Sequence, residues 1–77
     1  MSLYFLHVAN DDGITMDESG REFPDAEQAI VEASRTAGAI LADELREGRG
    51  HVSLKVYVED EQRNRRATVS LIGTLAR

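Results

Sequence analysis

The spacing of apolar residues changes along the chain and predicts short strands on both sides of one long helix. Residues 3–9 have the pattern of a first strand with apolar side chains on both faces, and residues 14–17 that of a short returning strand. Residues 21–23 form a brief extended piece before the single proline. Residues 52–58 alternate most regularly and predict a strand with one aliphatic face, and residues 66–72 predict the last strand.

Residues 25–47, between these strands, have the period of an amphipathic helix. Asp25 is a good N-cap, and Gln28 three residues later completes a capping-box pattern. Gly38 lies inside the helix, where glycine costs about 1 kcal/mol relative to alanine. Close packing against the sheet or against another chain would offset that cost. The apolar stripe of the helix consists of Ala26, Ala29, Ile30, Ala33, Ala37, Ile40, Leu41 and Leu45.

Glu44 lies by its helical angle in the middle of this apolar stripe, where an unpaired buried carboxylate would be costly. The helix would be about 33 Å long and the strands only about 23 Å. We therefore expect the helix to cross the sheet diagonally and to overhang it. Glu44 should then lie past the edge of the sheet, or pair with Arg49 or His51.

These elements predict an α+β fold of ββαββ order, with residues 1–77 forming a single small domain. An antiparallel sheet of three or four strands would carry the helix on one face. The other face would hold Leu3 and several further apolar residues that nothing within the chain covers, and such a patch usually marks a contact surface. The interface candidates are Phe5, His7, Tyr57 and Ile72.

Length and composition favour association as the means of adding stability. A single core in a chain of 77 residues supplies only about 3–5 kcal/mol of net stability. The chain has no cysteine and only two histidines, so the composition excludes disulfides and thiolate metal sites and argues against any metal site. The N-terminus has neither the basic region of a signal peptide nor a long apolar stretch, so we expect a cytoplasmic protein that does not enter a membrane.

Charge is distributed unevenly between the two halves of the chain. The net charge is −5, with −8 carried by residues 1–47 and +3 by residues 48–77. An acidic chain is a poor non-specific ligand for nucleic acid, because phosphate contacts are driven by charge. We therefore expect protein partners rather than nucleic acid, with Arg63, Arg65 and Arg66 contacting an acidic surface of another chain.

Candidate catalytic and metal-binding residues each have a simpler structural interpretation. Asp11, Asp12 and Asp17 lie near Gly13, but the spacing does not match a calcium-binding EF-hand loop and is typical of a polar hairpin turn. His7 has no serine or cysteine partner at a recognisable spacing, which favours a structural or interface histidine. We therefore assign no catalytic, cofactor-binding or metal-binding residue, and no cofactor.

The order of motifs resembles the short bacterial proteins grouped as domain-of-unknown-function family 6894. The motifs are the aromatic opening strand of residues 4–8, the acidic-glycine turns at 11–13 and 17–20, the segment 22–25 before an alanine-rich helix, and a valine-rich strand ending at 59–61. The resemblance implies a fold and no catalytic residue. A looser similarity is to HicB-like antitoxins, which resemble a partial RNase-H-like fold with three strands before the helix.

Three functions are therefore open at this point. The first is a non-enzymatic module that forms a homodimer, or binds another protein, through the sheet face opposite the helix or through a sheet edge. The second is a HicB-like antitoxin or regulator that binds a basic partner protein. The third is a small enzyme that uses His7 and nearby acidic residues.

Overall fold

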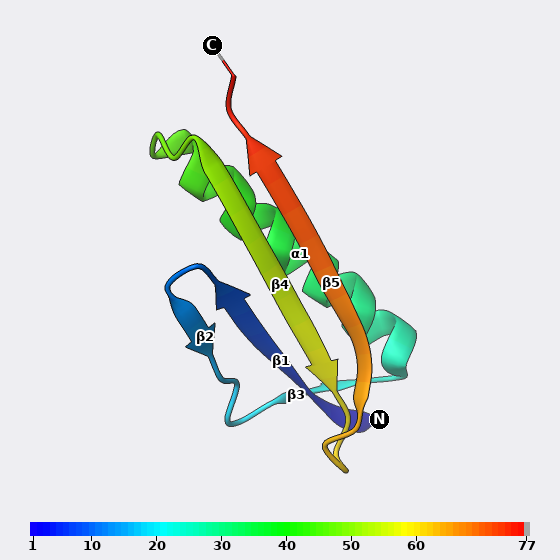
Figure 1. The fold of residues 1–77 in the computed structure, drawn as a ribbon. Helices are drawn as coiled ribbons and strands as arrows, with labels where there is room; N and C mark the ends of the chain where they lie inside the picture. The colour runs from blue at the N-terminus through cyan, green and yellow to red at the C-terminus, as the bar shows by residue number, and fades with distance from the viewer. Residues whose placement is uncertain (77) are drawn as a thin grey trace.

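The computed structural model describes residues 1–76 and shows one antiparallel sheet with a single helix on one face (Figure 1). The sheet order is β2-β1-β4-β5, and β3 also pairs with β1. The predicted α+β fold is confirmed. The sheet has five strands instead of three or four, because two three-residue strands both pair with β1. The elements are β1 (Ser2–Asn10), β2 (Gly13–Thr15), β3 (Arg21–Phe23), α1 (Ala26–Arg46), β4 (His51–Glu59) and β5 (Arg65–Thr74).

The register of the sheet places β1 and β4 at its centre. Tyr57 in β4 lies opposite His7 in β1 and opposite Thr68 in β5. β5 continues to Thr74, two residues beyond the predicted end of the last strand at residue 72. A side chain at Gly73 would come within 2.8 Å of a methyl group of Leu41. Glycine at this position therefore lets β5 run on beneath the helix.

The hydrophobic core lies between α1 and the aliphatic face of β4. The buried alanines of α1 have no exposed surface, and they allow the helix backbone to approach the sheet closely. Opposite them, the inward side chains of β4 are almost fully buried. Burying one such valine or leucine contributes about 1.5–3 kcal/mol. The residues of this layer are Ala29, Ala33 and Ala37 in the helix and Val52, Leu54, Val56 and Val58 in the strand.

Asp25 caps the helix as predicted. Its backbone is extended, and its carboxylate accepts a hydrogen bond of 2.9 Å from the backbone N–H of Gln28. The reciprocal half of the capping box is not formed, since within residues 1–76 the Gln28 side chain makes no hydrogen bond to Asp25. Glu27 in the first turn and Arg46 in the last turn both complement the helix dipole.

Glu44 finds neither of its expected partners. The Arg49 guanidinium lies 3.6 Å from the Asp12 carboxylate, and His51 lies beside Thr74. Glu44 is half-buried on the core side of α1, with one carboxylate oxygen that has no hydrogen-bond partner.

Figure 1 shows α1 crossing the sheet diagonally, from beyond β5 at its N-terminal half to behind β4 at its C-terminal end. Within residues 1–76, no helix is both long and apolar enough to cross a membrane.

Candidate interaction surface

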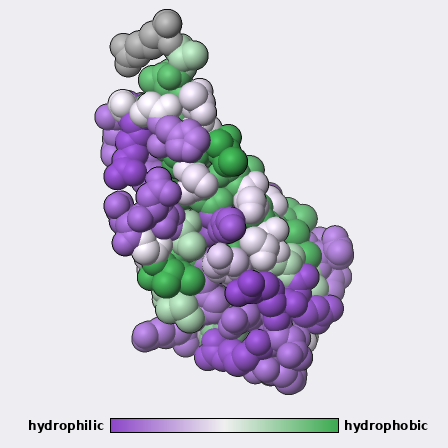
Figure 2. Space-filling model, in the orientation of Figure 1, coloured by the Kyte–Doolittle hydropathy of each residue, from purple (hydrophilic) through white to green (hydrophobic). Residues whose placement is uncertain are grey.

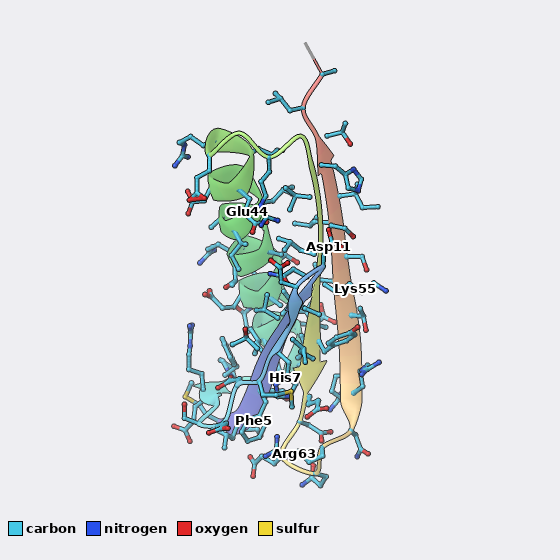
Figure 3. All side chains as sticks on the ribbon, turned by 60° about the vertical axis from the view of Figure 1, so that its left-hand side comes forward. Phe5, His7, Asp11, Glu44, Lys55 and Arg63 are labelled. Atoms are coloured by element: carbon cyan, nitrogen blue, oxygen red, sulfur yellow. The ribbon has the colours of Figure 1, made fainter. Side chains whose placement is uncertain are left out.

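The sheet face opposite α1 is partly covered by the chain itself. Phe5 is only 6% exposed and His7 only 2%, so the expectation that nothing covers this face is wrong for both residues. The segment between β2 and β3 folds back over them, and its Gly20 lies against the Phe5 ring. From the other side, the Arg63 guanidinium lies 4.0 Å from the centre of the same ring. Figure 3 shows Phe5 and His7 along β1, with Arg63 below them at the β4–β5 turn.

His7 ties this covering segment to the sheet. The backbone N–H of Asp17 donates to His7 Nδ1 at 2.9 Å, and His7 Nε2 lies 3.0 Å from Glu59 Oε1. Because a backbone amide can only donate, Nδ1 carries no proton and Nε2–H donates to Glu59. Both ring nitrogens are therefore engaged, and the ring itself is buried. This arrangement makes His7 a structural residue and leaves it poorly placed to act as a base.

Asp17 is the second anchor of the segment, and the sequence pattern did not single it out for this role. Its carboxylate accepts the backbone N–H of Leu6 at 3.1 Å and that of Gly20 at 2.9 Å. Burial raises the pKa of Asp17, but hydrogen bonds from Gly20, Leu6 and Ser19 outweigh it, so the net pKa is lowered. The pKa of Glu59 is also lowered, chiefly by its hydrogen bond with His7. Both groups therefore favour the ionised form in the fold.

The other two interface candidates remain on the open part of this face. Tyr57 is half-buried, with the Arg65 guanidinium 4.2 Å from its ring centre. Ile72 is 70% exposed and lies on β5. Tyr57 and Ile72 are therefore available for contact, whereas Phe5 and His7 are not. Their role in association stays a prediction.

The three arginines expected to contact a partner all have neighbours within the chain. Arg63 lies 3.6 Å from Glu59, and Arg66 lies 3.6 Å from Asp60. Arg65 stacks on Tyr57 instead. The side chains are largely exposed, so these ion pairs contribute little stability. Contact of the three arginines with another protein remains a prediction.

Two hollows lie on the surface of the described residues, one near each end of β1. One hollow of about 140 Å³ lies beside the β4–β5 turn, and one of about 250 Å³ lies where β1 ends beside Lys55. His7 lines neither of them. Within residues 1–76, no three His, Asp or Glu side chains cluster in a way that could hold a metal ion.

One side of β5 forms a free edge of the sheet, a position that the sequence pattern did not reveal. β5 is ten residues long, and within the described residues it pairs with β4 alone. Leu75 N–H donates to Gly50 across this ladder. Because hydrogen-bonded positions alternate in an antiparallel ladder, the backbone groups of every second residue point away from β4. These residues are Thr68, Ser70, Ile72 and Thr74.

Hydrophobic residues follow the side of the molecule where α1 passes beyond β5, whereas hydrophilic residues gather at the β4–β5 turn (Figure 2). The alternation of Thr68, Ser70 and Ile72 marks the solvent-facing side of this strand, but no sequence signal shows that the strand lies at an edge of the sheet. The unpaired edge of β5 and the adjoining side of α1 together form the candidate interaction surface.

Comparison with known proteins gives a family and no closer relative. No curated protein and no solved structure matches the chain. The model of the family described as domain of unknown function DUF6894 matches residues 3–72, which is most of the chain. This agrees with the order of motifs in the sequence and with the strand-helix-strand order of the fold. The chain therefore belongs to the DUF6894 family.

Proposed function

We propose that this protein is a non-enzymatic interaction module that accepts a partner strand along the free edge of β5. The observation that carries the proposal is the row of unpaired backbone groups on a strand of ten residues. An exposed edge of this length is a template for pairing with another chain. Added strands bind through main-chain hydrogen bonds, and the neighbouring side chains provide specificity.

The composition of β5 is that of a contact surface rather than of an edge strand protected against pairing. Edge strands that must not pair usually carry lysine, proline or an inward-pointing charge. β5 has two arginines at its start, and residues 67–74 contain neither a charge nor a proline. Ile72, at 70% exposure, adds an apolar side chain next to the edge. Protein is therefore the favoured partner, and nucleic acid is not.

Amide hydrogen exchange tests this proposal residue by residue. In dilute solution, the amides of Thr68, Ser70, Ile72 and Thr74 should exchange quickly, because they face solvent. At high protein concentration, or with native cell extract added, a partner strand should protect these four amides. Protection absent under all conditions, while association occurs through another surface, would contradict the proposal.

Two variants distinguish strand pairing at the β5 edge from non-specific association through exposed apolar side chains. Ile72→Lys places a charge beside the edge, and Ser70→Pro removes one outward N–H, which edge strands tolerate. Both should abolish the added protection. Ile14→Lys is the matched control, because Ile14 is 53% exposed but lies on β2, far from β5 in the sheet order. Circular dichroism should show that all three variants remain folded.

A further inference from the structure

The two flanks of α1 differ sharply in character. Leu41 and Leu45 contact Gly73, so one flank of the helix lies toward β5. Glu32 pairs with Arg21 of β3 at 3.5 Å, so the charged flank lies toward the other edge of the sheet. Beyond the first turn of α1, the β5 flank carries no charged residue. Its outer positions are Val31, Ser34, Gly38 and Ala42.

Gly38 is the residue on this flank that the chain alone does not explain. Among the described residues, a Cβ at Gly38 would meet no atom within 4 Å apart from the neighbouring backbone of the helix, so close approach of the sheet does not require glycine there. Glycine inside a helix costs about 1 kcal/mol relative to alanine. Val31 beside it is 48% exposed. Both observations are accounted for if another helix packs against this flank.

We propose that the partner at the β5 edge is a second copy of this chain, related by a two-fold axis that passes by Leu71. This inference rests on the proposed function, because it names the occupant of the same edge. A bare strand would cover only the backbone groups of β5. A second copy also brings its own α1 to the same face of the extended sheet, beside the uncharged flank.

The hydrogen-bonding positions restrict the register of such a dimer. Hydrogen-bonded pairs must join residues whose backbone groups face the edge. A register centred on Leu71 places Thr68 opposite Thr74 of the partner subunit, and Ser70 opposite Ile72 of the partner subunit. All four edge residues of each chain are then used, giving about eight hydrogen bonds. Registers centred on Ser70 or Ile72 would pair only three of the four edge residues of each chain.

Charge also favours an antiparallel second copy. Arg65 and Arg66 stand at the start of β5, and the remainder of the strand is uncharged. Two-fold pairing places the arginines of the two chains at opposite ends of the shared ladder. Parallel pairing would set like charges side by side, which is destabilising. The opposed threonines of the antiparallel register instead form a favourable cross-strand pair.

The helices of such a dimer would run side by side in opposite directions. A two-fold rotation perpendicular to the sheet turns the diagonal path of α1 into a parallel line with reversed direction. The spacing between the two helices is therefore constant, and the flanks of both can meet along their length. Gly38 allows the helix backbones to approach without displacing any side chain of the same protomer.

Cysteine crosslinking tests this register cleanly, because the chain has no native cysteine. Leu71→Cys places two thiols on the proposed axis, at a pair not joined by hydrogen bonds, where Cβ atoms come close enough for a disulfide. We expect a covalent dimer on mild oxidation. Ser70→Cys and Ile72→Cys should crosslink when mixed but not alone. Ile14→Cys is the matched control and should not crosslink.

Gly38→Leu tests the helix contact separately. The side chain has room in the single chain, so the fold should stay intact and the melting temperature should not fall. In the dimer it would separate the helices and weaken self-association by about tenfold or more, the scale of a clash at a packed contact. Sedimentation equilibrium measures this change. Unaltered self-association in Gly38→Leu would overturn the helix contact.

The outcomes separate the two proposals. A dimer by sedimentation without a Leu71→Cys crosslink would refute the proposed register. A monomer whose four edge amides become protected in cell extract would refute the second copy and retain the strand-accepting module. Edge amides that stay unprotected in both settings would refute the module itself.

Discussion

At the residue scale, the buried side chain of His7 joins the segment between β2 and β3 to the sheet. It is 2% exposed and accepts the backbone N–H of Asp17 on one ring nitrogen. Asp17 adds its own hydrogen bonds from Leu6 and Gly20. The covering segment thus depends on one imidazole and one carboxylate.

The protonation of these groups predicts acid sensitivity. The pKa values of Asp17 and Glu59 are lowered from 3.8 and 4.5, so their stabilisation is complete above those values. It is lost as the pH falls through the lower folded values. We expect the melting temperature to fall as the pH drops below about 4.5.

Asp17→Asn supplies the comparison for this prediction. It should lower stability at neutral pH and make the acid dependence shallower, because one titrating carboxylate is gone. Glu18→Gln removes the same charge from an exposed neighbour and should leave the acid dependence unchanged. Equal acid dependence in Asp17→Asn and the unaltered protein would contradict this account.

Glu44 predicts a gain in stability on substitution. One of its carboxylate oxygens is buried without a hydrogen-bond partner, on the face of α1 that packs toward the sheet. Glu44→Leu should raise the free energy of unfolding by about 1 kcal/mol, since an unsatisfied buried polar group costs about 1–3 kcal/mol. Glu44→Gln keeps the shape and a polar group and should give a smaller gain. Urea denaturation measures both, and a loss in Glu44→Leu would refute the interpretation.

At the element scale, α1 depends on its N-terminal cap. Asp25→Ala should lower the free energy of unfolding by about 0.5–2 kcal/mol, because the Gln28 N–H loses its acceptor. Gln28→Ala is the control, since its side chain makes no hydrogen bond to Asp25 and only the backbone N–H is used. A similar loss in both variants, measured in urea, would mean that the cap is not the cause.

Periodicity explains why the elements could be predicted and the covering segment could not. Residues 52–58 alternate and residues 25–47 repeat with helical spacing, so β4 and α1 are visible in the sequence. Asp17 and His7 meet through bonds between side chains and backbone groups, which leave no period. Gly73 has the pattern of a strand end, yet its missing side chain is what the packing of Leu41 requires. Local pattern therefore identified elements better than contacts between them.

At the scale of the whole molecule, the candidate surface follows from the place of β5 at the end of the sheet, where one of its sides is unpaired. The sequence predicted a contact surface on the open face or at an edge, but strand order depends on pairings between distant residues. The structure places β5 at the end of the sheet and beside the uncharged flank of α1. The interface candidates were chosen by the sheet face on which they lie. They therefore included Phe5 and His7, which are buried by other residues of the same chain.

The central position of β1 also has a consequence for the order of folding. β4 meets β5 across the short turn of residues 60–64, whereas Phe5 must find Glu59 across nearly the whole chain. Closing the larger loop costs more entropy and slows folding. We expect Val56→Ala to slow refolding and Leu6→Ala mainly to speed unfolding, as chevron plots would show. The reverse pattern would contradict this order. We therefore expect the first strand in the sequence to join the sheet only after β4 and β5 have paired, with β2 and β3 following because both pair with β1.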